Sequence, residues 1–185
     1  MLKARFSADR GSHFEPAVTL TNVATGPAQA FALGNRIAVV YPEPDGIKLR
    51  SKTTGAFGPE RVVAPFSSDQ TFKNGYTPTV TLFGQQTIGV AWSECRRANC
   101  TGVNGTSPKG VDVAWRESTD NGATWKAKVA LTNSTSTASG SNSRRISDNP
   151  LILYTSSTTR HVVYNTSSIN FSTSQLQLRT GRGAP

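Results

Sequence analysis

Apolar and polar residues alternate along short segments of this chain, and the clearest example is VDVAWR at residues 111–116. A period of two is typical of a half-buried strand, because successive side chains point to opposite faces of a sheet. Residues 128–131, KVAL, form a second apolar run a few residues later. The intervening STDNGATW, residues 118–125, is rich in Asp, Asn and Gly, which favour turns. The pattern therefore predicts a β-hairpin.

A longer pattern repeats ahead of such hairpins. The segments AQAFALGNRIAVVY, PTVTLFGQQTIGVAW and PLILYTSSTTRHVVY each hold an apolar strand, a polar turn and a second strand that ends in an aromatic residue. With the hairpin strands, each unit has four short strands, which is typical of a propeller blade. The tail LQLRTG is similar to IKLRSKTTG, so the last unit is expected to reach its third strand. The predicted blades are about 1–22 (partial), 27–66, 77–133 and 149–185 (partial).

Residues that recur at one place in every unit are expected to have a structural role. The aromatic residues that end the second strand, Tyr41, Trp92 and Tyr164, are therefore predicted core residues. The third strand repeatedly carries an arginine, which we expect to be structural or solvent-facing: Arg5, Arg50, Arg116 and Arg179.

The hairpin turn carries a motif with its own spacing, S-x-D-x-G-x-T-W, which is complete at residues 118–125. SADRGSHF is a second copy, in which His13 stands at the Thr position, and SKTTGAF is a decayed third copy without the Asp. This motif is the Asp-box, and with it the chain resembles the sialidase (neuraminidase) superfamily of BNR-repeat β-propellers. The box residues are Ser7, Asp9, Gly11 and Phe14; Ser51, Gly55 and Phe57; and Ser118, Asp120, Gly122, Thr124 and Trp125.

The resemblance implies an all-β fold of sialidase-like blades, each a four-stranded antiparallel sheet. Residues 1–185 are expected to form a single segment, either an incomplete propeller or half of a six-bladed ring that a homodimer closes. It also implies that the boxes are structural. In Asp120 the carboxylate is expected to accept hydrogen bonds from backbone N–H groups of the turn, while Trp125 packs between strands.

In this superfamily the active site lies on the face opposite the boxes, where the loops between the second and third strands and between blades meet. Loops on a rigid scaffold concentrate functional residues. The three long loops of this kind are 66–78, 93–110 and 133–149. Their candidate ligand-binding residues are Asp69, Tyr76, Glu94, Arg96, Arg97, Arg144, Arg145 and Asp148.

The resemblance does not assign catalytic residues. Sialidases hold the substrate carboxylate with arginines and use a Tyr nucleophile, a Glu and an Asp, all types present in these loops. However, the Arg-Ile-Pro motif is absent, because Arg36 and Ile37 are followed by Ala38. Glu43 and Glu94 both follow the strand-two aromatic by two positions, which favours a structural role. Three functions stay open: a glycan-binding module, a sialidase-like hydrolase fragment and a structural protein-binding segment.

Charge narrows the choice of partner. Twenty Lys and Arg against eleven Asp and Glu give a net charge of +9, which attracts anions. The basic residues are scattered without an interleaved aromatic platform, so an anionic glycan is favoured over nucleic acid. No apolar run reaches the roughly 18 residues of a membrane span.

The remaining features bear on the compartment. Cys95 and Cys100 could close a small disulfide, which would favour an oxidising compartment; as half of a zinc site they lack partners. The N-terminal MLKARFSADRG is not a signal peptide. Because a disulfide favours an oxidising compartment, the full-length protein is nevertheless expected at the cell surface or outside the cell. Nothing in the sequence calls for a metal or cofactor.

Overall fold

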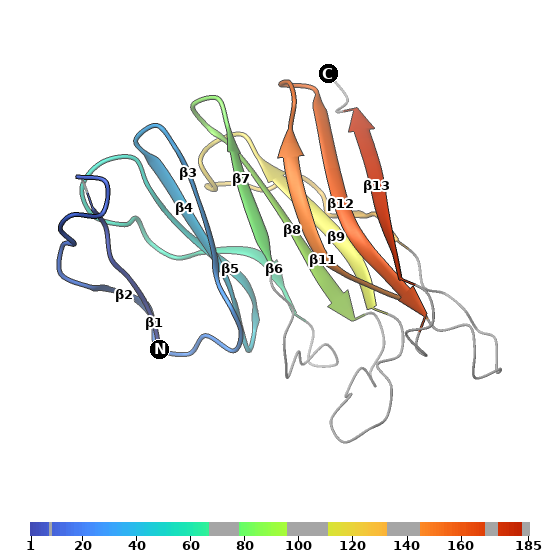
Figure 1. Cartoon of the computed structure of the whole chain (residues 1–185), viewed down its shortest axis with the longest axis horizontal. Helices are drawn as coiled ribbons and strands as arrows, with labels where there is room; N and C mark the ends of the chain where they lie inside the picture. The colour runs from blue at the N-terminus through green and yellow to red at the C-terminus, as the bar shows by residue number, and fades with distance from the viewer. Residues whose placement is uncertain (8, 67–77, 96–110, 133–144, 169–173, 183–185) are drawn as a thin grey trace.

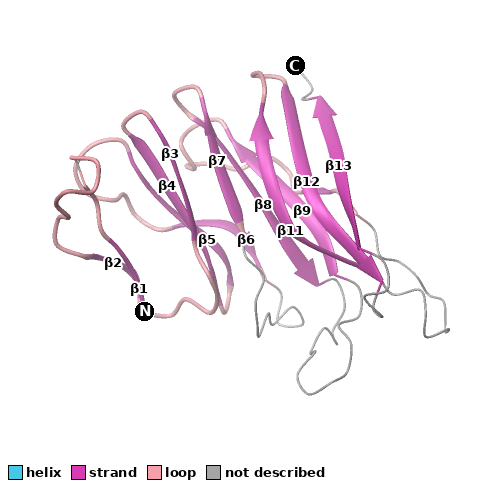
Figure 2. Cartoon of the chain, in the orientation of Figure 1, coloured by secondary structure: helices cyan, strands magenta, loops and turns pink. Residues whose placement is uncertain are grey.

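The computed structural model describes residues 1–7, 9–66, 78–95, 111–132, 145–168 and 174–182, with the backbone alone for Cys95, Val111, 145–149, 166–168 and 174–182. Within these ranges every regular element is a β-strand, and no helix is present (Figure 2). The predicted all-β class is confirmed. No helix of the described residues could span a membrane, in agreement with the sequence.

The strands form four consecutive antiparallel units. The first is the hairpin of β1 (Leu2–Ala4) and β2 (Val18–Thr21). The second unit has the strands β3 (Gln29–Leu33), β4 (Arg36–Glu43), β5 (Gly46–Lys52) and β6 (Arg61–Pro65). The third has β7 (Thr79–Phe83), β8 (Thr87–Cys95), β9 (Val111–Ser118) and β10 (Val129–Ala130), and the fourth has β11 (Arg145–Tyr154), β12 (Thr159–Ser168) and β13 (Ser174–Arg182).

Each unit is a meander in which every strand pairs with the next one along the chain. The third and fourth units are also joined by one parallel pair, Ile146 with Val111, which makes a single hydrogen-bonded sheet of seven strands. None of the sheets closes on itself, so the fold is an incomplete propeller. Figure 1 shows β3, β7 and β11 arranged side by side as the first strands of successive units.

The core lies between neighbouring units, because the faces that two units turn towards each other carry the buried apolar side chains. One apolar cluster joins the first two units around Tyr41, a second joins the second and third around Trp92, and a third joins the last two around Tyr164. These three aromatic residues are at most 2% exposed. The recurring aromatic at the end of the second strand is therefore the anchor that fixes one sheet on the next.

The recurring arginine of the third strand has the same kind of partner, a backbone carbonyl, in each of the three units where its side chain is described. Its Nε donates a hydrogen bond to a backbone carbonyl of the returning chain: Arg5 to Glu15, Arg50 to Gly58 and Arg116 to Lys126, at 2.8–3.1 Å. The bond closes the long hairpin between the third and fourth strands. These arginines are structural, and the side chain of Arg179 lies outside the described residues.

The meander gives every sheet two different ends. The turns after β1, β3, β5, β7, β9 and β11 lie at one end, which we call the box end because it carries the Asp-box turns. The connections after β4, β6, β8 and β12 leave from the other end, which we call the loop end. The two ends are separated by the full length of the strands.

Candidate functional site

The strand termini that flank the three predicted binding loops all lie at the loop end. They are the last residues of β6, β8 and β10 and the first residues of β7, β9 and β11. Five candidate residues lie outside the described residues: Asp69, Tyr76, Arg96, Arg97 and Arg144. Arg145 and Asp148 lie in β11, where their backbones pair with Ser168 and Asn165, and their side chains are likewise not described. The proposed disulfide also falls outside, since only the backbone of Cys95 is described.

Glu94 is the one candidate whose side chain is described, and it is buried at the end of β8. It is 4% exposed, and its carboxylate accepts a hydrogen bond from Trp92 Nε1 at 3.2 Å. Lys128 Nζ donates to both carboxylate oxygens, at 2.8 and 3.0 Å. An ion pair in this position satisfies the buried charge. Glu94 therefore holds the loop end of the third unit together.

Glu43 occupies the equivalent place on β4 and is also buried, at 7% exposed. Its carboxylate accepts a short hydrogen bond, 2.5 Å, from Thr21 Oγ1 of the preceding unit. The two glutamates thus share position and burial but not partners, because one bonds within its own unit and the other reaches its neighbour. Both contacts have a structural role, as the repeated spacing in the sequence predicts.

Other polar side chains are buried beside Glu94. Asp112 pairs directly opposite Glu94 on β9, is 1% exposed and accepts a hydrogen bond from Thr132 Oγ1 at 2.8 Å. Ser93 points to the other face of β8, and its buried hydroxyl has no partner within the described residues. No group of three side chains that could hold a metal ion is present in the described part of the chain.

At the box end, the turn at 118–125 is closed by its own side chains. Ser118 Oγ donates to Asp120 Oδ1 at 2.7 Å and accepts from the Gly122 N–H at 2.7 Å. Asp120 then accepts from the Thr124 N–H at 2.8 Å and from its hydroxyl at 2.6 Å. These bonds lower the pKa of Asp120 to about 2. The bonds are those expected of a turn-closing Asp, although the backbone donor lies four residues on.

The N-terminal copy has the same geometry. Ser7 Oγ donates to Asp9 Oδ1 at 2.7 Å and accepts from the Gly11 N–H at 2.7 Å, while Asp9 accepts from the His13 N–H at 2.8 Å. The His13 ring replaces the Thr hydroxyl, with Nδ1 2.5 Å from Asp9 Oδ2. Two sequences that share the motif thus fold into the same turn.

The decayed copy at 51–57 keeps the turn without the carboxylate. Gly55 has a φ of +63° and the Phe57 ring is 8% exposed, so the glycine and aromatic positions keep their roles. The Gly58 N–H donates to the Ser51 carbonyl at 2.9 Å. A backbone hydrogen bond and aromatic packing therefore hold this turn.

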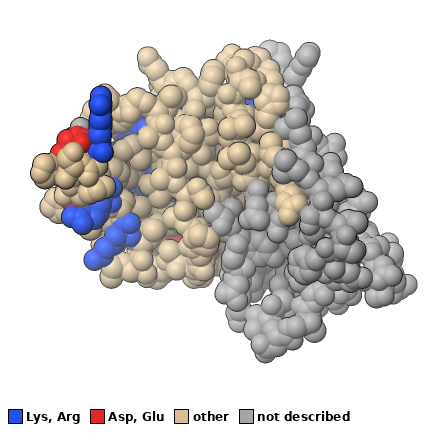
Figure 3. Space-filling view, viewed as in Figure 1, with Lys and Arg blue, Asp and Glu red and all other residues tan. Residues whose placement is uncertain are grey.

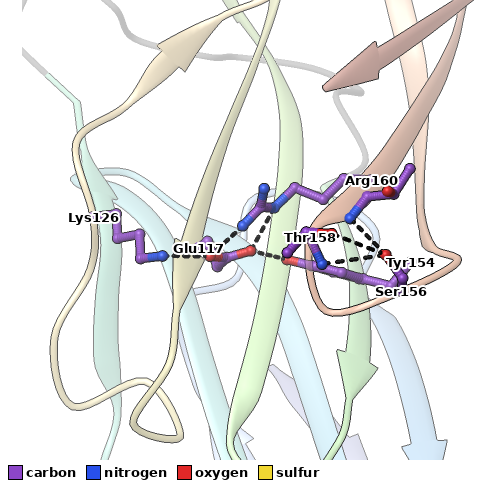
Figure 4. Close-up of polar contacts among 7 residues, drawn as sticks. Glu117, Lys126, Tyr154, Ser156, Thr158 and Arg160 are labelled. Atoms are coloured by element: carbon purple, nitrogen blue, oxygen red, sulfur yellow. Dashed lines mark hydrogen bonds and ion pairs between the residues drawn. The ribbon is translucent and has the colours of Figure 1, made fainter. Parts of the chain in front are cut away.

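A buried ionic cluster, which the sequence did not indicate, links the third and fourth units at the box end (Figure 4). Arg160 of β12 donates to both carboxylate oxygens of Glu117 in β9, from Nε at 2.6 Å and from Nη2 at 2.7 Å. Lys126 Nζ and Tyr154 Oη donate to the same carboxylate, at 2.8 and 2.7 Å. Glu117 is 2% and Arg160 6% exposed. We call these four residues the Glu117 cluster.

Desolvation raises the pKa of Glu117, but the hydrogen bonds from Arg160, Lys126 and Tyr154 together outweigh it and lower the pKa to about 2. Burial and the hydrogen bond to Glu117 raise the pKa of Tyr154 well above its usual value. A glutamate that is so weakly basic does not take the proton of so weak an acid. The cluster brings Tyr, Glu and Arg together, but its electrostatics suit a structural clamp.

One feature of the sequence could have indicated this cluster. In three units the first two strands form a hairpin. Only the hairpin of the fourth unit has a tyrosine, Tyr154, at the end of its first strand and an arginine, Arg160, near the start of its second. Arg36 begins β4 in the second unit, but it bonds forward to the Gly84 and Thr87 carbonyls and to Asn121. Sequence alone does not show which neighbour an arginine will reach.

No protein-family model matches this chain, and a search of curated proteins finds no significant match.

Proposed function

We propose that this chain is a sialidase-superfamily propeller module that binds anionic glycans through the loop end, in a protein of the cell surface or extracellular space. The observation that carries the proposal is the charge of the three loops whose flanking strands meet there. The loops contain six basic residues, Lys73, Arg96, Arg97, Lys109, Arg144 and Arg145, against Asp69, Glu94 and Asp148. Lys128, which directly precedes β10, already neutralises Glu94. The excess positive charge at this end attracts a carboxylate or sulfate ligand.

The described residues support binding over hydrolysis. A retaining sialidase-like reaction needs a nucleophile that a nearby base activates. The Tyr154–Glu117 pair is buried at the opposite end from the loops, and the raised pKa of Tyr154 keeps its phenol protonated. Glu94 is buried in an ion pair. Neither glutamate is therefore placed to act on a glycan at the loop end.

The test is calorimetric titration with sialyllactose, which carries a carboxylate, and with lactose, which does not. We expect saturable binding of sialyllactose and at least about tenfold weaker binding of lactose, since a charge-assisted hydrogen bond contributes about 1.5–3 kcal/mol. Arg96→Gln/Arg97→Gln is expected to weaken sialyllactose binding by tenfold or more. Lys3→Gln/Arg10→Gln, which removes two charges on the first unit and outside the three loops, is the matched control and is expected to have no effect.

Equal affinity for lactose, or sialyllactose binding that survives the arginine substitutions, would contradict the proposal. A fluorogenic sialoside provides the second readout. Turnover that Arg96→Gln/Arg97→Gln abolishes would instead favour the hydrolase. If neither binding nor turnover occurs, the chain is a structural or protein-binding segment.

A further inference from the structure

Basic side chains gather at the end of the molecule that β1, β2 and their connecting turn form. Figure 3 shows Lys and Arg there, while the rest of the described surface in the same view shows few. The gathering comes from two segments that are distant in sequence, residues 3–15 and 50–57. They contribute Lys3, Arg5, Arg10, Arg50 and Lys52, against only Asp9 and Glu15. We call this region the N-terminal basic surface.

None of these five cations forms an ion pair with any described carboxylate. By contrast, Lys48, Lys126, Lys128 and Arg160 each have one within 3 Å. Lys3, Arg5 and Arg10 are exposed. Arg5 and Arg50 donate hydrogen bonds to backbone carbonyls, which leave their charge uncompensated. The surface therefore keeps its positive charge available to a ligand.

The two acidic residues in these segments do not cancel that charge. The Asp9 carboxylate accepts hydrogen bonds from Ser7 Oγ and from the His13 N–H inside the turn. Glu15 bonds Arg5 through its backbone carbonyl. Both carboxylates keep their negative charge, so five cations against two carboxylates leave a net charge of +3 on these residues and a positive potential.

Aromatic rings lie between these cations, which corrects the expectation from the sequence that the basic residues have no interleaved aromatic residues. Lys52 Nζ is 4.0 Å from the centroid of the Phe6 ring, and Phe6 in turn packs against Phe57 with centroids 5.4 Å apart. Arg5 Cζ lies 5.9 Å from the centroid of Phe14. Phe14 is 55% exposed, although Trp125, at the corresponding box position, packs against the core. An exposed ring beside unpaired cations is able to stack with a planar group.

We infer that the N-terminal basic surface binds single-stranded nucleic acid, with a base stacked on Phe14 and phosphates bound by Lys3, Arg5 and Arg10. Proteins that bind single strands combine a cationic track with aromatic stacking, and arginine adds cation–π contacts to the bases. A sulfated glycan would use the same cations and is able to place the C–H face of a sugar on Phe14. A nucleobase presents a planar π face to both Phe14 and the neighbouring Arg5, which favours the nucleic acid.

The surface lies on the first unit and includes none of the proposed glycan-binding loops. The test uses the full chain and a 5′-fluorescein oligothymidylate of about 12 nucleotides, within the site size of single-strand-binding folds. Fluorescence anisotropy is measured over a range of salt concentrations, with a size-matched heparin oligosaccharide as competitor. We expect Phe14→Ala to weaken oligothymidylate binding by roughly 5- to 150-fold, the loss typical of one stacked base.

Lys3→Gln/Arg10→Gln should reduce the slope of log K against log salt by about 1.4, because each phosphate contact contributes about 0.7. Arg96→Gln/Arg97→Gln removes the same charge at the loop end and is expected to leave oligothymidylate binding unchanged. Phe14, Lys3 and Arg10 form no hydrogen bonds through their described side chains, so these variants are expected to fold, which circular dichroism checks.

The inference is wrong if oligothymidylate does not bind at low salt. It is also wrong if Phe14→Ala has no effect and the heparin oligosaccharide binds equally well, since the surface would then attract any polyanion. Equal losses in the two double-Gln variants would likewise show that net charge, and not this surface, governs binding. The glycan titration uses a different ligand and different arginines, so either proposal is able to fail alone.

Discussion

The polar contacts between the third and fourth units converge on the carboxylate of Glu117. Four hydrogen bonds reach its carboxylate, two from Arg160 and one each from Lys126 and Tyr154. The arginine and tyrosine come from the fourth unit, so a single side chain carries much of the polar contact between two sheets. A bidentate pair of this kind also fixes the relative orientation of its two strands.

Glu117→Gln is predicted to be strongly destabilising. The amide keeps the shape but leaves the buried Arg160 without an opposing charge, which typically costs about 3–5 kcal/mol. Lys126→Gln is the matched control, because the Lys126 side chain is 54% exposed and an exposed partner contributes below about 1 kcal/mol. Urea denaturation of the three proteins measures both. Equal losses in the two variants would show that the buried pair with Arg160 has no special weight.

The same residue predicts how stability depends on pH. The pKa of Glu117 is about 2 in the folded protein, against an ordinary value of 4.5. Between these values the unfolded chain binds the proton and the folded chain does not, so stability falls as the pH drops through this window. Glu117→Gln should make the fall between pH 4.5 and 2 shallower. Asp9 and Asp120 also have a pKa near 2, so part of the fall should remain.

At this scale the sequence predicted the residues that repeat and missed those that do not. The aromatic anchors and the turn-closing role of Asp120 follow from spacing, because each unit imposes the same environment on the same position. The pairing of Glu117 with Arg160 depends on which side chains of two neighbouring units meet in space. The spacing of residues within one unit does not show this. Most of the predicted ligand-binding residues lie outside the described residues and stay predictions.

The packing of one element on the next depends on close approach at Gly89. This residue lies in the middle of β8, where a strand interior usually carries a side chain. A Cβ at this position would lie 2.7 Å from Tyr154 Oη, 2.8 Å from its Cε2 and 2.9 Å from Ile152 Cδ1. The glycine therefore admits the β11 side chains that hold the fourth unit on the third.

Gly89→Ala is predicted to destabilise the protein by about 1–3 kcal/mol, the usual cost of overpacking a core. The added methyl group would displace Tyr154 and weaken its bond to Glu117. In a Tyr154→Ala background the same change should cost less, because two of the three closest contacts are to Tyr154 and only one is to Ile152. Thermal unfolding of the four proteins in this double-mutant cycle measures the coupling. Additive losses would show that the backbone of β8, not the tyrosine, opposes a side chain at residue 89.

The sequence predicted the all-β class because period-two runs and turn residues are local signals. It also predicted that the last unit reaches a third strand, which is β13. The single parallel pair between Ile146 and Val111, which merges two units into one sheet, has no such local signal. Contacts between units depend on side chains that meet in space.

Across the whole molecule, the outermost described strands, β1 and β13, each pair on one side only. Free edges of this kind are able to pair with another chain. A second copy would therefore be able to extend the fourth unit beside β13 with its β1–β2 hairpin. Leu151 and Leu153, 50% and 43% exposed, lie on the free face of that unit.

We therefore expect two chains to associate. Size exclusion with light scattering should give twice the 19.7 kDa mass of the chain, and Leu153→Lys should shift the protein towards the monomer. Val129→Lys, on an equally exposed apolar residue of the third unit, is the control. A mass of one chain at every concentration would contradict this expectation.

The central claim is that anionic glycans bind at the loop end of the sheets, and mapping by NMR tests it most directly. Amide shifts of the ¹⁵N-labelled protein are followed during titration with sialyllactose. We predict saturable shifts in the residues that flank the loops, at the ends of β6 and β8 and the starts of β7, β9 and β11. Shifts confined to the Asp-box turns or to the N-terminal basic surface, or no saturable shifts, would contradict the claim.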